Sequence, residues 1–404
     1  MANTLTPIDS YSLINSIAQQ AQARTSLTAT DTSSFVAVGE TILRTGYENT
    51  LNAISTVLSR TIFASRPYSS KLRIMQVEEE RWGAQVRKIT YLPKAAEASK
   101  DMNNNLDATV LDDGASVDPW VINKPVPVQF NFYGTKLLQR SITKFKHQLD
   151  LAFTNEQEFA RFIEGYMTEL MNDIEQDYEA RKRACLINFI AGKQAMSSNV
   201  VDLVYAYNNR DANNPTTYTR EQLLTTYRED FLKFVAATIK IDSDLMTNRT
   251  KEYHVTPATC PTYILRHTEK SKQRMIMYGP FFTAMETEVM PTIFNPEYLN
   301  IGEFEKVDYW QAFSTPTAIN VVPNIMNVNT GASETASAAV TLDYVLGVLY
   351  DVDAIGTFKQ FDWAASTTMN PRGGYMNEFF HWKFNEYNDY TENAIVYILG
   401  AGGQ

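Results

Sequence analysis

The fold of this chain is decided by residues 154–195, TNEQEFARFIEGYMTELMNDIEQDYEARKRACLINFIAGKQA. Apolar side chains recur there at helical spacing without a proline, which predicts one helix over 154–195. Thr154 and Gln157 have the spacing of a capping box, and Gly192 stands where a helix could end. At about 1.5 Å per residue the helix would be roughly 60 Å long. Since the apolar spacing keeps no strict heptad, we interpret it as the strut of a subunit and not as an isolated coiled coil.

Composition limits the class of protein. The chain has 404 residues, 44% of them hydrophobic, which is enough for about two or three domains. Its net charge of −10 is opposite to that of proteins that bind nucleic acid by charge. The two cysteines, Cys185 and Cys260, cannot form a disulfide framework, and we expect Cys185 to be a buried free thiol. No apolar run approaches 18 residues, so we predict no membrane-spanning helix.

The part before the long helix divides into an arm and a loop. Residues 1–65 are expected to be an arm with a helix after Asp9, a Ser/Thr-rich linker over 25–34 and a second helix over roughly 36–58. The β-rich segments 71–91 and 121–133 then predict a long two-stranded loop with a polar tip. Pro125 and Pro127 place the second strand at an edge.

Charge separates along this loop. Residues 66–94 carry a net charge of +4, and residues 95–120 carry −5. Complementary patches set the register between subunits, so we predict that the loop docks on an oppositely charged neighbour; solvated surface charge is the alternative. The candidate subunit-interface residues are Arg66, Arg73, Arg81, Arg87, Asp112, Asp113 and Lys144.

The chain after the long helix reads as an α/β region. We expect helices over 219–239 and 263–277, strands over 318–322 and 340–350, an exposed loop over 327–338, and a closing β-hairpin formed by 375–382 and 392–399. The first of these helices is predicted to begin at Thr219, with Gln222 three residues on.

Residues suited to catalysis or metal binding are scattered. The chain has no glycine-rich phosphate loop and no Gly-x-Ser-x-Gly elbow. The spacing of His254, Cys260 and His267 matches no common zinc pattern. Asp351 and Asp353 could hold a divalent cation if both lay in one strand, but we interpret them as a surface or turn pair. We therefore predict no catalytic residue, no metal and no cofactor.

The order of these parts, together with several short stretches, resembles a known family. The stretches are Arg66-Pro67-Tyr68, Arg81-Trp82-Gly83, Lys124-Pro125, Asn131-Phe132-Tyr133-Gly134, Phe159-Ala160-Arg161-Phe162-Ile163, Leu186-Ile187-Asn188-Phe189-Ile190-Ala191-Gly192, Asp353-Ala354-Ile355-Gly356, Asn370-Pro371-Arg372-Gly373 and Tyr390-Thr391-Glu392-Asn393. They resemble the major capsid protein of tailed bacteriophages with the Hong Kong 97-type fold. The resemblance is greatest to small short-tailed phages of Gram-positive hosts, the picovirus group.

The resemblance implies an α+β fold with an N-terminal arm, an extended β loop called the E-loop, a long spine helix in a peripheral (P) domain, and an α/β axial (A) domain. By this resemblance the arm is 1–65, the E-loop 66–135 and the P domain with the spine helix 136–200. The A domain, with some P-domain segments, is 201–360, and closing P-domain strands occupy 361–404.

The implied function is self-assembly into pentamers and hexamers of an icosahedral or prolate head shell around double-stranded DNA. The implied partners are further copies of the chain, a separate scaffolding protein, a portal protein, head fibre or decoration proteins, and packaged DNA in loose contact. The implied location is the virion shell, assembled in the host cytoplasm and not at a membrane. Alternatives are a protein-cargo compartment of the same fold, a tail or fibre component, and a metal-dependent enzyme using Asp351, Asp353 and His381.

Overall fold

A computed structural model describes the chain in two compact units. Unit 1 comprises 1–84, 134–184 and 357–386, and unit 2 comprises 85–133, 185–356 and 387–404. The described residues are 7–20, 28–44, 70–77, 86–94, 100–101, 109–110, 116, 118–120, 122, 124–132, 136–145, 156–288 and 303–402. The predicted cap at Thr154 and most of the predicted loop tip lie outside them.

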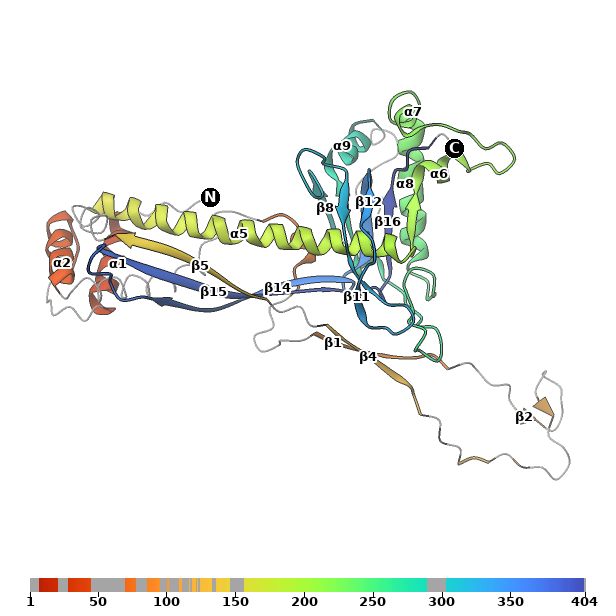
Figure 1. Cartoon of the computed structure of the whole chain (residues 1–404), viewed down its shortest axis with the longest axis horizontal. Coiled ribbons are helices and arrows are strands. Elements are labelled where there is room, and N and C mark those ends of the chain that lie inside the picture. Colours follow the sequence, from red (N-terminus) through yellow and green to blue (C-terminus); the bar gives the residue numbers. More distant parts are fainter. Residues whose placement is uncertain are drawn as a thin grey trace. The chain divides into compact units, whose positions relative to one another are not determined.

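The long helix is confirmed as α5, Glu156–Ala195, with 40 residues (Figure 1). It does not end at Gly192. A Cβ at that position would come within 2.1 Å of the Tyr390 hydroxyl oxygen, so the glycine admits the Tyr390 ring against the helix. That ring stacks on Phe189 of α5, with ring centres 5.2 Å apart and planes 2° from parallel.

In unit 1, α5 packs on a three-stranded sheet. The strand order is β14 (Ile355–Ser366), β15 (Tyr375–Asn388) and β5 (Lys136–Phe145). Figure 1 shows α5 running along this sheet. The buried face of β15 presents Phe380, Trp382 and Phe384 to one stripe of α5. Tyr178 of that stripe meets Phe384 edge to face, with ring centres 5.3 Å apart. The helix and the sheet thus share one apolar core.

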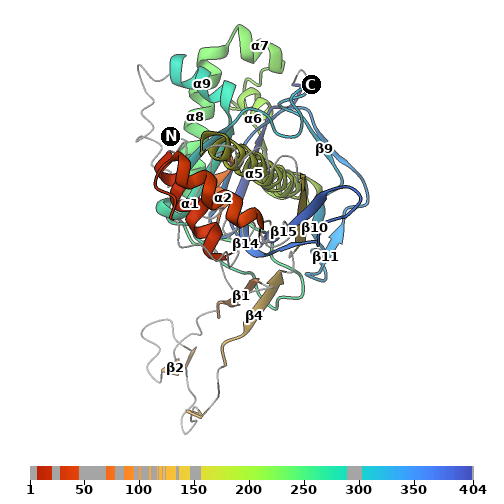
Figure 2. The ribbon, with the colours of Figure 1, turned by 90° about the vertical axis from the view of Figure 1, so that its left-hand side faces the viewer.

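The arm contains two helices that pack on each other, α1 (Pro7–Gln20) and α2 (Thr32–Arg44) (Figure 2). The first is the predicted one. The second begins inside the predicted linker because the Asp31 carboxylate accepts a hydrogen bond from the Ser34 amide at 2.7 Å, which caps it. Its predicted extension to residue 58 lies outside the described residues.

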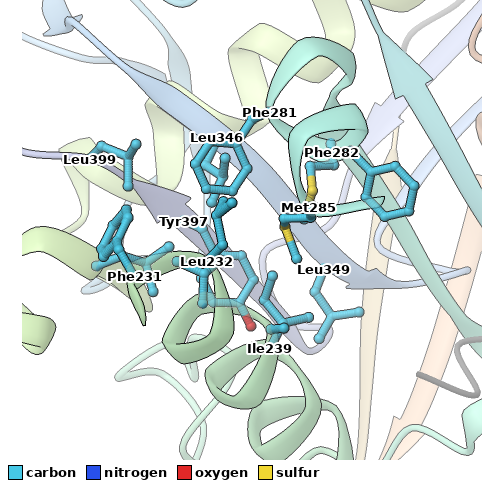
Figure 3. Packing of buried hydrophobic residues seen from close by; sticks show 14 of the residues in the cluster. Phe231, Leu232, Ile239, Phe281, Phe282, Met285, Leu346, Leu349, Tyr397 and Leu399 are labelled. Carbon is cyan, nitrogen blue, oxygen red and sulfur yellow. The ribbon is translucent and has the colours of Figure 1, made fainter. Parts of the chain in front are cut away.

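Unit 2 is built on a five-stranded mixed sheet, in the order β6 (Val200–Asp202), β16 (Ala394–Ile398), β13 (Val345–Asp351), β7 (Gln273–Tyr278) and β8 (Glu303–Val307). The unit also contains helices α6 (Leu203–Asn208), α7 (Arg220–Thr225), α8 (Arg228–Leu245) and α9 (Gly279–Glu288). Figure 3 shows their shared core, where Phe231 and Ile239 of α8 and Met285 of α9 meet Leu349 and Tyr397 of the sheet.

In its described residues, unit 2 also contains four small two-stranded sheets. They pair β1 (Val86–Tyr91) with β4 (Pro127–Phe132), β2 (Lys100–Asp101) with β3 (Thr109–Val110), β9 (Ile319–Val321) with β12 (Val340–Leu342), and β10 (Asn324–Met326) with β11 (Ser333–Thr335). The first pair confirms the predicted two-stranded loop, and the strand predicted over 318–322 is confirmed as β9. The strand predicted over 340–350 is two strands, β12 and β13, which lie in different sheets. The predicted loop over 327–338 is exposed but contains β11.

Three sequence-based predictions about single elements are wrong. Residues 73–75 form a 3-10 turn, η1 (Arg73–Met75), and not a strand, because Leu72 adopts a left-handed backbone with φ of 62°. The helix predicted over 219–239 is two helices, although its capping box at Thr219 is present. The helix predicted over 263–277 is wrong because residues 273–277 belong to β7, an interior strand whose apolar residues run continuously since both faces are buried.

The predicted closing hairpin is also wrong. β15 pairs with β5 in unit 1, and β16 pairs with β13 and β6 in unit 2, so the two strands belong to different sheets. Consequently, the closing residues 361–404 do not all join one sheet, and 394–398 lie in the sheet of unit 2. The tight turn between β14 and β15 is instead at Asn370, whose side chain accepts from the amides of Arg372 and Gly373 at 3.0 Å.

Candidate subunit interface and its anchor

The β1–β4 pair has two different faces. The antiparallel register places Val86, Lys88 and Thr90 opposite Phe132, Phe130 and Val128 on a half-buried inner face. The outer face carries Arg87, Ile89 and Tyr91 in β1, opposite Asn131, Gln129 and Pro127. Ile89 is 53% and Tyr91 63% exposed. We call Arg87, Ile89 and Tyr91 the outer loop face.

Further apolar side chains are exposed in the same segment of unit 2. Trp120 is 85% and Ile122 79% exposed. The Trp120 amide donates to the Asp118 carboxylate at 2.8 Å, which fixes the backbone beside the indole. Large exposed apolar side chains gathered in one segment are typical of a surface that a partner covers.

The predicted interface residues lie in different environments. Arg87 lies on the outer loop face, and Arg73 is exposed in η1. Lys144 is 2% exposed, and its ammonium lies 2.5 Å from the Glu378 carboxylate, which is itself fully buried. This burial does not support the placement of Lys144 at a subunit contact. The others lie outside the described residues: Arg66, Arg81, Asp112 and Asp113.

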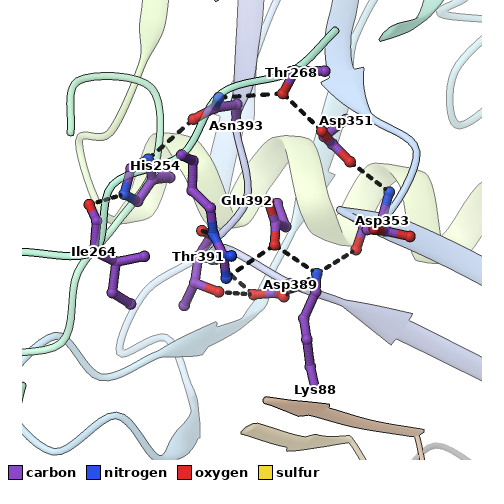
Figure 4. Close-up of polar contacts among 11 residues, drawn as sticks. Lys88, His254, Ile264, Thr268, Asp351, Asp353, Asp389, Thr391, Glu392 and Asn393 are labelled. Atoms are coloured by element: carbon purple, nitrogen blue, oxygen red, sulfur yellow. Dashed lines mark hydrogen bonds and ion pairs between the residues drawn. The ribbon is translucent and has the colours of Figure 1, made fainter. Parts of the chain in front are cut away.

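Lys88 connects the inner face of β1 to the turn between β15 and β16 (Figure 4). Its ammonium lies 2.9 Å from the Asp389 carboxylate and 2.8 Å from the Glu392 carboxylate, and it donates to the Asp353 carbonyl at 3.3 Å. Burial disfavours the charge on Lys88, but the two carboxylates outweigh that cost and raise its pKa above the ordinary value. The lysine is therefore charged at every physiological pH.

Both carboxylates of this cluster are buried and held by further bonds. Asp389 is 1% exposed and accepts from the amide and hydroxyl of Thr391 at 2.8 and 2.6 Å. Glu392 lies 3.0 Å from the Arg266 guanidinium as well as beside Lys88. Burial raises the pKa of Glu392, and the two cations limit that rise. We call Lys88, Arg266, Asp389 and Glu392 the anchor cluster.

A chain of hydrogen bonds extends from the anchor cluster (Figure 4). The His254 ring lies 3.0 Å from the Asn393 side-chain oxygen and 2.8 Å from the Ile264 carbonyl. Asn393 donates to Thr268, and Thr268 donates to the Asp351 carboxylate at 2.7 Å. Burial lowers the pKa of His254, and the bonds to Ile264 and Asn393 oppose that fall. The turn that receives Lys88 is thus bonded on several sides.

Three residues considered as metal ligands, His254, Asp351 and Asp353, take part in hydrogen bonds within the protein. Asp351 ends β13, and its carboxylate accepts from the Asp353 amide at 2.9 Å, which is a turn and not two side chains on one strand face. Across the described part of the chain, no group of three His, Cys, Asp or Glu side chains is arranged to hold a metal ion. Nor does any helix in that part have the length and apolar character to cross a membrane.

Cys185 is a buried free thiol, as predicted, and its sulfur donates to the Asn388 side-chain oxygen at 3.1 Å. Sequence reasoning counted Lys88 among the basic residues of the loop but did not separate it from Arg87. The signal was the alternation of β1, since a lysine on the same face as Val86 and Thr90 must find an acidic partner when that face is buried.

Comparisons with known proteins agree with this architecture. The family model for the Phi29-like phage major capsid protein matches residues 12–398. A capsid chain of Staphylococcus phage Andhra is similar in structure, with a TM-score of 0.52 at 9% identity over 81% of this chain and 84% of that one. A chain in the structure of the head fibre and inner core protein of native bacteriophage P68 is also similar, with a TM-score of 0.50 at 10% identity over 81% of this chain and 84% of that one. No curated protein sequence matches the chain.

The solved structures show a shared fold, since their identity is too low for more. The family match covers nearly the whole chain, including the outer loop face, α5 and the anchor cluster. Proteins of this family self-associate into a capsid shell, and the resemblance of the sequence to phage major capsid proteins is confirmed. The chain belongs to the Phi29-like phage major capsid protein family and is a shell-forming structural protein of the virion.

Proposed function

We propose that copies of this chain assemble as pentamers and hexamers into an icosahedral or prolate head shell that encloses double-stranded DNA. The fold in this proposal is of the Hong Kong 97 type. α5 is the spine helix, residues 66–135 are the E-loop, and the five-stranded sheet with its helices is the axial domain. A 40-residue helix and a separate two-stranded loop in one chain of this family support that assignment.

The outer loop face carries the proposal. Ile89 and Tyr91 are more than half exposed on a strand whose opposite face is already packed. Covering apolar surface yields about 25 cal/mol per Å², so a repeated contact over these side chains stabilises a shell. Arg87, beside Ile89 on the same face, supplies charge for pairing with the acidic segment 95–120 of a neighbouring copy.

The remaining partners follow from the same proposal. A separate scaffolding protein guides assembly, a portal protein occupies one vertex, and head fibre or decoration proteins attach outside. The net charge of −10 suits DNA that is confined without tight protein binding. The chain acts as a structural protein and not as an enzyme, which its membership of a capsid family supports.

Electron microscopy of the purified protein tests the proposal, with the chain expressed alone and together with the scaffolding protein of its own phage. Closed shells of uniform diameter, or rings of five and six subunits, are the expected result. A monomer or dimer under every condition, including with the scaffold, would contradict it.

Charge reversal on the outer loop face tests the proposed contact. Arg87→Glu should lower shell yield by about tenfold, since roughly 1.4 kcal/mol per contact corresponds to that factor. Because Arg87 is exposed, the circular dichroism spectrum and melting temperature of the unassembled chain should stay at wild-type values. Arg87→Lys keeps the charge and is the matched control, for which normal shells are expected. Wild-type yield from Arg87→Glu would remove Arg87 from the interface.

A further inference from the structure

The β1–β4 pair is joined to unit 2 through side chains. Its two strands form a sheet of their own, and the main-chain bond beyond them, from the Leu92 amide to the Val126 carbonyl, stays within the same loop. A two-stranded ribbon is marginally stable in water by itself. The direction in which the loop leaves the unit therefore depends on the side chains of its inner face.

Lys88 makes the strongest polar contacts on that face. It reaches two buried carboxylates and one carbonyl, while the Phe132 and Tyr387 rings add an apolar contact at 5.5 Å between centres. Farther along, the Thr262 hydroxyl donates to the Pro93 carbonyl at a long 3.5 Å. Charge-assisted bonds are about twice as strong as neutral ones, so Lys88 dominates this attachment.

The acidic turn that receives Lys88 is held by further hydrogen bonds. The Asp389 amide donates to the Ala354 carbonyl at 2.7 Å, and the Arg266 side chain donates to the Thr391 carbonyl at 3.3 Å. These bonds connect the acidic turn to the protein around it, so Lys88 binds to carboxylates whose backbone is already fixed. Because Lys88 pairs opposite Phe130 in the register, fixing the ammonium in β1 also fixes β4.

We propose that Lys88 is a positioning residue for assembly, whose ion pairs with Asp389 and Glu392 set the direction at which the loop meets a neighbouring subunit. This inference rests on the proposed contact between the loop and a second copy. It adds a requirement inside the chain, since the outer loop face can dock only if the inner face is anchored.

The first test is Lys88→Met in the full-length chain. Amide hydrogen exchange of residues 86–94 and 127–132 in the unassembled protein should become at least about tenfold faster, since loss of the charge-assisted bonds frees the ribbon. Shell yield should fall by about tenfold. Unchanged exchange in these strands would overturn the inference.

A general loss of stability must be separated from loss of position. Removing Lys88 leaves the buried Asp389 and Glu392 with one cation in the cluster, Arg266, which destabilises the unit as a whole. Lys88→Met with Asp389→Asn leaves Glu392 paired with Arg266 at 3.0 Å, so the melting temperature should return toward wild type. If Lys88 acted only by stabilising the fold, shell yield would recover together with the melting temperature. The inference expects fast exchange and few shells to persist, and recovery of both would overturn it.

Two further variants complete the experiment. Lys144→Met with Glu378→Met removes a buried ion pair in unit 1 and should leave exchange in 86–94 unchanged. Lys88→Arg keeps the charge and should retain shells. If wild-type protein forms no shells, the proposed function fails, while the exchange data still decide whether Lys88 anchors the ribbon. If wild type and the double variant at 88 and 389 form shells equally, the anchor fails and the shell function stands.

Discussion

Lys193 has no exposed surface, although it carries an ionisable group near the end of α5. Its ammonium lies 3.5 Å from the Tyr253 carbonyl and 5.8 Å from the centre of the Phe189 ring. Burial lowers its pKa to about 7, and the Asp389 carboxylate limits that fall. The folded chain therefore bears a cost for this lysine at neutral pH.

Replacing this lysine should stabilise the protein. Lys193→Met should raise the free energy of unfolding at pH 7 by about 3 to 5 kcal/mol, because the pKa of Lys193 is lower in the folded state than in the unfolded state. Between pH 7 and 10.5 the unfolded chain binds the proton more tightly, so wild-type stability rises with pH across this window. The advantage of Lys193→Met should shrink over the same range and vanish near its upper end. Urea unfolding at pH 7, 8, 9 and 10 measures this, and a difference that does not change with pH would contradict it.

At the scale of elements, the contact between α5 and its sheet combines an apolar stripe with ion pairs. Arg140 of β5 reaches the Asp173 and Asp177 carboxylates of α5 at 2.6 and 2.9 Å. These acids are more than two-fifths exposed, so water screens the pairs. Phe380 and Trp382 are buried against the same helix, and the apolar stripe therefore provides most of the adhesion.

Two substitutions on this sheet should differ greatly in effect. Phe380→Ala should lower the free energy of unfolding by about 3 to 5 kcal/mol, because it leaves a cavity under α5. Arg140→Gln should lower it by less than about 1 kcal/mol, because its pairs are screened. Chemical denaturation followed by near-ultraviolet circular dichroism compares them. Equal losses would mean that the ion pairs, and not the aromatic stripe, hold the helix.

Elements with a single strong periodicity could be predicted from the sequence, and those fixed by tertiary pairing could not. α5 was found because apolar side chains follow the helical period for about 40 residues, and the β1–β4 ribbon because its strands alternate. β7 was missed because Met275, Ile276 and Met277 are all buried, which removes the alternation. The closing hairpin was missed because the two strands nearest in sequence find partners elsewhere.

Arg87 was chosen from charge as an interface residue, and its side chain is exposed on the outer loop face. Its place in a subunit contact stays a prediction. Lys88 and its acids were missed, because Asp389 and Glu392 stand 301 or more residues along the chain from it. Contacts between such distant positions leave no periodic signal in a single sequence.

At the scale of the whole molecule, the arm contributes to unit 1 two helices that pack on each other. Ile14, Phe35 and Ile42 are buried, and the Tyr11 and Phe35 rings meet at 6.1 Å. Among the described residues, the aromatic core of α5 and β15 is built without residues of the arm. We expect the arm to act in contacts between copies.

Deletion of residues 1–44, which removes α1 and α2 together, should leave a folded chain whose shell yield is reduced by at least about tenfold. Circular dichroism and thermal unfolding report on the fold, and sedimentation with electron microscopy reports on shells. Loss of cooperative unfolding would show that the arm belongs to the core. Normal shells would show that assembly does not need it.

The position of β16 has a consequence for the order of events during synthesis. This strand lies between β6 and β13 in the five-stranded sheet, yet the ribosome makes it after all the others. The acidic turn that precedes it is made equally late. A growing chain therefore cannot complete the sheet of unit 2, or pair Lys88 with its acids, until residues 389–398 have been synthesised. A chain that a stalled ribosome cuts short before residue 389 lacks both features.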